Sequence, residues 1–177
     1  NGMSEFARAA ENANSALLVG VSEKDFGSSS PLAGMYFQRK LEENAFIAGG
    51  KSYRAPAVLA GDFLRRKNSR NLGEVRPSYL PGVVLGGFNQ LLPEEITESL
   101  RLGIVEMAKK LRGFDCYDAV LTGVETRSSS PVRIVRDETM QSNIKGLYPC
   151  GEGAGYAGGI TSAAADGLKA VYSLTED

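Results

Sequence analysis

Apolar residues at helical spacing predict a first helix in the first third of the chain. The repeating positions are Phe37, Leu41 and Ala45. Ser30 before Pro31 has the form of an N-cap followed by a proline in the first turn, and Gly49 with Gly50 supplies a stop. We therefore predict a helix from Pro31 to Ala48.

The clearest helical pattern begins at Pro93 and ends at Gly113. Its apolar stripe consists of Ile96, Leu100, Ile104, Ala108 and Leu111. Acidic residues follow the start and basic residues precede the end, an arrangement that the helix dipole favours. This pattern predicts a helix from Pro93 to Arg112.

A third pattern lies near the C-terminus of the sequence. Its apolar positions at helical spacing are Ile160, Ala164, Leu168 and Val171. We predict a helix from Thr161 to Leu174.

Short apolar runs between turn residues predict strands. These runs are 14–21, 52–64, 117–127, 131–137 and 146–150. Pro56 and Gly61 interrupt the second run, which we therefore predict to be an edge strand or an irregular one. Because strands and helices do not alternate regularly, we predict an α+β fold with a mixed or antiparallel sheet and two to four helices.

Composition and charge exclude several classes of function. The formal charge is −1, from 20 basic and 21 acidic residues, so nucleic acid is not an expected partner. No apolar run is long enough to cross a membrane and the first residues lack a signal peptide's apolar core, so we expect a cytoplasmic protein without a membrane partner. The two cysteines form no C-x-x-C pair and histidine is absent, which predicts no metal site and excludes Ser–His and Cys–His nucleophiles within the chain.

Residues 146–171 hold seven glycines and combine a short apolar run, a glycine loop and a predicted helix start. Such an arrangement aims backbone N–H groups and the positive end of the helix dipole at one point, which favours an anionic or carbonyl-rich ligand. Residues 153–158 satisfy G-x-G-x-x-G, but the second parallel strand with an acidic residue about 20 positions on is missing. A turn that only permits close packing is the alternative interpretation.

The run from Tyr148 to Ile160, followed by Ser162–Ala164 and Asp166–Gly167, resembles the C-terminal signature of a group of bacterial FAD-dependent dehydrogenases. Further blocks of the chain are similar to that family: NGMS, NANSALLVGV, PLAGMYFQRKLEENAFIAGG, YRAP, GDFL, PSYLPGV and GVETRSSSPVRI. The resemblance therefore covers nearly the whole chain.

The resemblance implies a fragment of a Rossmann-type FAD/NAD(P)-binding flavoprotein with its cap domain. Residues 1–125 would be the substrate or cap domain, and residues 126–177 the flavin-facing return segment of the FAD-binding domain. The partner would be the missing N-terminal Rossmann segment, which holds the ADP half of FAD. The implied reaction is hydride transfer between a small-molecule substrate and flavin, with FAD in the full-length protein and none bound to this chain, which would be inactive alone.

The resemblance also implies which residues lie at the flavin: Gly151, Glu152, Gly153, Ala154, Gly155, Gly158, Gly159, Ile160 and Thr161. Glu152 and the amides of Gly153 to Gly155 would face the ribityl–pyrophosphate stretch, and the later residues the pyrimidine edge. A solvated loop carboxylate is the alternative for Glu152. The resemblance assigns no catalytic acid or base.

Basic residues suggest two further contacts. Arg127 and Arg133 flank a serine loop and would bind a substrate carboxylate in a fork geometry, unless they are surface arginines in a polar turn. The basic patch consists of Arg65, Arg66, Lys67 and Arg70. It would meet a phosphate of a nicotinamide cofactor or form a solvated loop. A non-catalytic binding module, using the glycine loop for a phosphate ligand or a protein partner, is the alternative to an oxidoreductase.

Overall fold

The computed structural model describes residues 6–127 and 129–175, which divide into two compact units. The sheet unit comprises the described part of Asn1–Val21 together with Lys40–Val124. The C-terminal unit comprises Ser22–Arg39 together with the described part of Glu125–Asp177.

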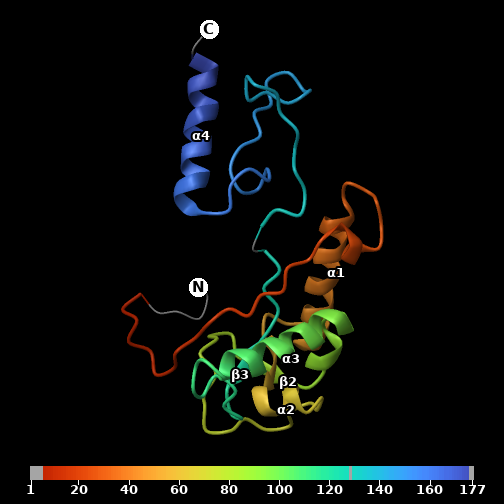
Figure 1. Ribbon diagram of the computed structural model, residues 1–177, viewed down its shortest axis with the longest axis vertical. Helices are drawn as coiled ribbons and strands as arrows, with labels where there is room; N and C mark the ends of the chain where they lie inside the picture. Colours follow the sequence, from red (N-terminus) through yellow and green to blue (C-terminus); the bar gives the residue numbers. More distant parts are fainter. Residues whose placement is uncertain (1–5, 128, 176–177) are drawn as a thin grey trace. The chain divides into compact units, whose positions relative to one another are not determined.

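The elements of the described residues follow in the order η1 (Glu23–Phe26), α1 (Ala33–Ala48), β1 (Ala55–Leu59), α2 (Ala60–Leu64), β2 (Val83–Leu85), η2 (Phe88–Gln90), α3 (Glu94–Ala108), β3 (Val120–Thr122) and α4 (Ile160–Thr175). The fold class is α+β, as predicted. The sheet has the order β2-β1-β3 and is mixed (Figure 1). Its central strand β1 runs parallel to β2, with Ala57 opposite Leu85, and antiparallel to β3, with Ala57 opposite Thr122.

The three predicted helices are confirmed with small changes at their ends. α1 begins at Ala33 rather than at Pro31, and Ser30 accepts a hydrogen bond from the Ala33 amide at 2.9 Å. α3 ends at Ala108 rather than at Arg112. α4 begins at Ile160, one position before the predicted start.

Of the two alternatives predicted for 52–64, the edge strand is wrong, and the expected interruption of the strand is present. β1 is the central strand, and the chain turns at Ala60 into the short helix α2 instead of continuing as a strand. Pro56 is tolerated because it precedes the first antiparallel pair with β3, and its carbonyl still accepts a hydrogen bond from the Gly123 amide at 3.1 Å. Gly61 permits close packing, because a Cβ there would overlap the ring of Tyr117.

Three apolar runs that were expected as strands, 14–21, 131–137 and 146–150, form none in the structure. Leu17 packs against the core of the sheet unit, whereas Leu18 and Val21 of the same run are exposed, so the run is only partly covered and pairs with no strand. The Ile134 amide donates to the Ala154 carbonyl at 3.2 Å, a bond to a loop instead of a ladder. β2, which no pattern predicted, contains only three residues and takes its extended form from pairing with β1.

The core of the sheet unit is apolar and built from several elements. Its buried members are Val58, Phe63, Phe88, Leu91 and Ile104. The rings of Phe63 and Phe88 meet edge to face with centroids 5.9 Å apart. Full burial of one such side chain stabilises the fold by about 1.5–3 kcal/mol.

In the C-terminal unit, α4 lies beside irregular loops (Figure 1). The buried apolar residues of the described part of this unit include Ala33, Pro149, Ala154 and Ala170. The apolar stripe of α4 is exposed, with 93% of Ile160 and 56% of Leu168 accessible to solvent. The helix therefore turns a small-residue side toward its own unit and leaves its larger apolar side chains uncovered.

The division between Val124 and Glu125 lies next to the predicted boundary between residues 125 and 126, while Ser22–Arg39 groups with the C-terminal residues. The roles assigned to residues 1–125 and 126–177 remain predictions. Every helix in the described ranges is too short or too polar to span a membrane.

Candidate functional site

The glycine loop, residues 151–159, is a series of turns leading into α4. The amide of Gly155 donates to the carbonyl of Glu152 at 3.0 Å, and that of Tyr156 donates to the carbonyl of Gly151 at 3.1 Å. Gly155 has φ +85°, and a Cβ there would lie 2.7 Å from the carbonyl oxygen of Val132. The sequence requires glycine at this point because the backbones approach too closely for any side chain.

A bidentate ion pair fixes the base of the loop to α4. The two terminal nitrogens of Arg136 donate to the carboxylate of Asp166 at 2.9 and 2.7 Å, and one of them also donates to the Pro149 carbonyl at 2.8 Å. The Gly151 amide donates to the same carboxylate at 2.9 Å. With side chains only 11% and 13% exposed, Arg136 and Asp166 join the 131–137 segment, the loop and the helix.

Electrostatics make this pair a permanently charged one at neutral pH. The hydrogen bonds from Arg136, and after them the bond from the Gly151 amide, lower the pKa of Asp166 to about 2. The hydrogen bonds to Asp166 raise the pKa of Arg136 above its ordinary value. Asp166 lies within the family signature, but no role was predicted for it. A carboxylate inside a small-residue helix was the available signal, since aspartate is a poor helix former.

Tyr156 lies under two arginines. The guanidinium of Arg136 is 3.6 Å and that of Arg133 4.9 Å from the centre of its ring, and its hydroxyl donates to the Ile134 carbonyl at 3.0 Å. Arg133 also donates through Nε to the Gly155 carbonyl at 3.0 Å. The structure thus places Arg133 on the glycine loop.

Arg127 is exposed, and the serine loop between it and Arg133 includes residue 128, which lies outside the described residues. The substrate fork of these two arginines therefore stays a prediction. The side chain of Glu152 is also exposed, so its contact with a ribityl group stays a prediction as well.

One side of the glycine loop is bare backbone. A Cβ added at Gly153 or at Gly158 would meet nothing within 4 Å. Of the three loop amides assigned to the flavin, that of Gly155 is used within the loop, while those of Gly153 and Ala154 have no acceptor in the described part of the chain. This side therefore offers backbone donors to a ligand that approaches closely.

The start of α4 adds further donors. The Gly159 amide is capped by Ser162 Oγ at 3.1 Å, and the Ala163 amide donates to the Gly159 carbonyl at 2.8 Å. The amides of the first turn after Gly159 have no carbonyl four residues earlier in the helix, as at any helix start. Ile160 and Thr161 are exposed, so this turn is open to a ligand. Bare glycine backbone with N–H donors fits a flavin, whose carbonyl and phosphate oxygens accept hydrogen bonds.

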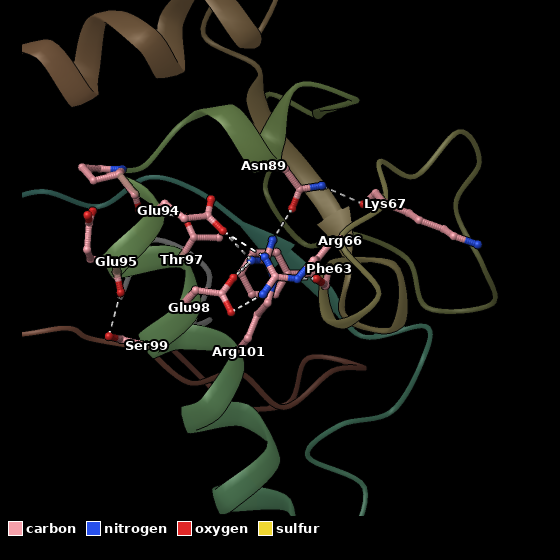
Figure 2. Close-up of polar contacts among 11 residues, drawn as sticks. Phe63, Arg66, Lys67, Asn89, Glu94, Glu95, Thr97, Glu98, Ser99 and Arg101 are labelled. Atoms are coloured by element: carbon pink, nitrogen blue, oxygen red, sulfur yellow. Dashed lines mark hydrogen bonds and ion pairs between the residues drawn. The ribbon is translucent and has the colours of Figure 1, made fainter.

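The sheet unit holds a separate polar network around Arg101, which is only 7% exposed. Figure 2 shows its guanidinium between Glu98, Asn89 and the main chain of Phe63. Arg101 Nε donates to the Phe63 carbonyl at 2.9 Å, and Nη2 donates to Asn89 Oδ1 at 3.0 Å. Arg66 bonds Glu94 at 3.0 Å and Glu98 at 2.5 Å. This network joins α3 to the end of α2 and η2, which is a structural task.

A second polar cluster anchors the loop after α2. Ser69 Oγ donates to Asp62 at 2.6 Å and accepts from the Leu59 amide at 2.9 Å, while the Tyr117 hydroxyl donates to Asp62 at 2.7 Å. The bonds from Ser69 and then Tyr117 lower the pKa of Asp62, and the bond to Asp62 raises the pKa of Tyr117. No group of three acidic, histidine or cysteine side chains within the described ranges is placed to hold a metal ion.

Comparison with known proteins bears on both units. Residues 1–128 match the family described as "FAD-dependent protein, C-terminal domain-like". A relative from Clostridium beijerinckii, named only as an uncharacterized protein, is 51% identical over 177 residues, which cover 99% of this chain and 33% of the relative. The chain thus spans about a third of the length of that relative. The family match covers the sheet unit, whereas the glycine loop lies outside its matched range.

Proposed function

The chain belongs to the family of FAD-dependent protein C-terminal domains, and we propose that it is the C-terminal part of an FAD-dependent oxidoreductase. In the full-length protein, bound FAD would exchange a hydride with a small-molecule substrate. The sheet unit would be the substrate-side or cap domain. The C-terminal unit would return to the flavin-binding domain.

The observation that carries this proposal is the uncovered surface of the C-terminal unit. The apolar stripe of α4 and the bare side of the glycine loop are both exposed, although a soluble protein normally buries groups of this kind. The relative is about three times as long as this chain, so a longer protein has residues available to cover both surfaces. We propose that an N-terminal Rossmann segment packs on α4 and completes the FAD site.

The residues that would hold the flavin are the exposed amides of Gly153 and the first turn of α4, with Ala154, Glu152 and Gly151 beside them. The positive end of the α4 dipole would favour negative charge on the flavin ring and would raise its reduction potential. Arg136 and Asp166 would act as positioning residues, because they fix the loop to the helix and their side chains are largely buried.

This proposal can be tested in the full-length protein by measuring bound flavin from its visible absorbance. Glu152→Ala should weaken FAD retention by about tenfold or more, since a hydrogen bond to a charged group contributes about 1.5–3 kcal/mol. Glu138→Ala, an exposed carboxylate of the same unit outside the loop, is the matched control. Unchanged flavin content in Glu152→Ala would remove that residue from the site, and a full-length protein without flavin would contradict the proposal as a whole.

The 177-residue chain supplies a second test. We expect no saturable quenching of flavin fluorescence when FAD is added at micromolar concentrations. A few amide contacts and a dipole contribution of about 0.3–1 kcal/mol do not offset the several kcal/mol lost in translational and rotational freedom. Saturable quenching by the chain would instead favour a self-sufficient binding module.

A further inference from the structure

An open concave surface with a volume of about 750 Å³, called the cavity below, lies in the sheet unit and is lined by Lys67, Asn68, Ser69, Arg70, Leu85 and Gly86. Leu85 is the last residue of β2, and Ser69 bonds the amide of Leu59, the last residue of β1. Because β1 and β2 are parallel, their carboxyl ends meet at one edge of the sheet. The cavity is therefore built where parallel strands commonly present ligand-binding loops.

The structure divides the four cations of the basic patch into two pairs. Arg65 stacks on the ring of Tyr117 at 5.2 Å, and Arg66 forms ion pairs with Glu94 and Glu98. Lys67 and Arg70 line the cavity instead, and neither has an ion-pair partner in the ranges that the structure describes. Two cations within four residues thus line one concave surface without an ion pair of their own, although the charge of Asp62 acts on Lys67 through space.

The remaining walls suit an anion. The ionised carboxylate of Asp62 opposes an anion, but it is not part of the lining, and its two oxygens are held by hydrogen bonds from Ser69 and Tyr117. Gly86 adds no side chain, and a Cβ there would meet nothing within 4 Å, so a ligand can approach its backbone. The Asn68 Oδ1 atom accepts from Asn89 at 3.2 Å, which leaves the Asn68 NH₂ group as a donor.

We propose that this cavity binds an oxyanion group, a phosphate or a carboxylate, of a small molecule. Arg70 would contribute its planar fork of donors and Lys67 a mobile point charge. The site belongs to the sheet unit and uses no residue of the glycine loop, so it stands independently of the flavin proposal.

A second concave surface of the same unit provides the comparison. It has a volume of about 510 Å³ and is lined by Val105, Ala108, Lys109, Lys110, Arg112, Gly113 and Asp115. Here Lys109 is paired with Glu106 at 2.5 Å, and Asp115 adds a carboxylate to the wall. These negative charges disfavour an anion, although the number of cations is larger.

The test is a titration of the full chain, followed by amide NMR, with inorganic pyrophosphate in one arm and succinate in the other. Sodium chloride at matched ionic strength corrects for screening. We expect saturable shifts at residues 67–70 and 85–86, in the pyrophosphate arm for a phosphate site or in the succinate arm for a carboxylate site. Shifts confined to other residues, or no saturable shift in either arm, would overturn the proposal.

Lys67→Gln with Arg70→Gln should weaken binding by about tenfold or more, because charge-assisted hydrogen bonds are lost. The fold should survive, since the bonds of Lys67 to Asp62 and Asn89 are made by its main chain. Lys110→Gln with Arg112→Gln removes the same charge from the other concave surface and should leave affinity unchanged. Equal weakening by both double variants would show non-specific attraction and would overturn the proposal.

Discussion

The two units of the chain are stabilised in different ways. The sheet unit has a core of large side chains, including Phe63, Phe88 and Ile104, that converge from α2, η2 and α3. In the described part of the C-terminal unit the buried apolar residues are small, three alanines and Pro149, and a charged pair, Arg136–Asp166, links its segments. An alanine buries much less apolar area than a phenylalanine or isoleucine, so hydrophobic stabilisation is concentrated in the sheet unit.

This difference agrees with what we propose for each unit. A unit with its own apolar core is suited to hold a concave surface in place. A unit that is joined mainly by polar links and leaves the apolar stripe of α4 exposed is suited to completing a larger structure. The exposed stripe and the small size of the buried apolar residues therefore support the same proposal, in which α4 packs on another segment of the proposed full-length flavoprotein.

The largest expected effect is loss of the sheet-unit core. Ile104→Ala should lower the free energy of unfolding by about 2–5 kcal/mol, because Ile104 is 1% exposed and its truncation leaves a cavity. Leu102→Ala on the same helix is the control, since Leu102 is 66% exposed and should change stability by less than about 0.5 kcal/mol. Urea unfolding monitored by circular dichroism measures both. Similar losses of unfolding free energy in the two variants would mean that this core is not the main source of stability of the sheet unit.

A second large effect should come from a clash in the same unit. Gly61→Ala should destabilise by about 3 kcal/mol, because the new methyl group would overlap the ring of Tyr117. Gly103→Ala in α3 meets no atom within 4 Å and should stabilise by about 0.5–1 kcal/mol. Thermal unfolding of the two alanine variants should therefore shift in opposite directions. A shift in the same direction would contradict the packing of Tyr117 on α2.

In the C-terminal unit the critical change is polar. Asp166→Asn should cost about 1.5 kcal/mol, the lower end of the range for a bond to a charged group, because asparagine keeps one acceptor for Arg136. Hydrogen exchange should accelerate at the amides of Gly151 and Tyr156, while the amides of β1 stay protected. Glu138→Gln, which removes an exposed carboxylate, should change neither set. Unchanged exchange at the amides of Gly151 and Tyr156 in Asp166→Asn would show that the ion pair does not fix the loop to α4.

The same pair predicts a smaller, pH-dependent effect. The pKa of Asp166 is lowered to about 2 in the fold by its bonds from Arg136 and Gly151, against about 3.9 in an unfolded chain. A depressed folded pKa means that the stabilisation is complete above about pH 4 and is lost as the pH falls toward 2. The protection factor of the Gly151 amide, which is the exchange rate of an unfolded chain at the same pH divided by that of the folded chain, should fall as the pH falls through this window in the wild type. The protection factor should lose that dependence in Asp166→Asn. A protection factor of the wild-type Gly151 amide that stays constant between pH 4 and 2 would contradict the stabilising role of ionised Asp166.

The sequence predicted elements whose pattern is local and missed features that depend on distant residues. The helices α1, α3 and α4 follow from periodicity and end signals, which lie within each segment. The central place of β1 and the existence of β2 depend on a partner about 28 residues away, as the pairing of Ala55 with Val83 shows, and no local run encodes it.

The candidate sites show the same limit. The glycine loop was visible as a motif, but the Arg136–Asp166 pair joins positions 30 residues apart, so no spacing rule within one element reveals it. The basic patch was also visible as a run of charges. Only the structure distinguishes Lys67 and Arg70, which line the cavity, from Arg65 and Arg66, which have aromatic and acidic partners.

The most direct test of the central claim is a double variant that combines Leu168→Ser and Val171→Ser. Its effect is measured in the 177-residue chain and in the full-length protein, and the two results are compared. Both side chains are more than half exposed here, at 56% and 55%, so the variant chain should unfold within about 0.5 kcal/mol of the wild type. In the full-length protein we predict a loss of about 2 kcal/mol or more together with a fall in bound flavin, because the stripe would be buried there. Lys169→Ser on the same helix is the control and should change neither quantity. If the full-length double variant keeps its stability and its flavin, α4 does not pack on a flavin-binding segment, and the proposed place of this chain in an FAD-dependent protein is wrong.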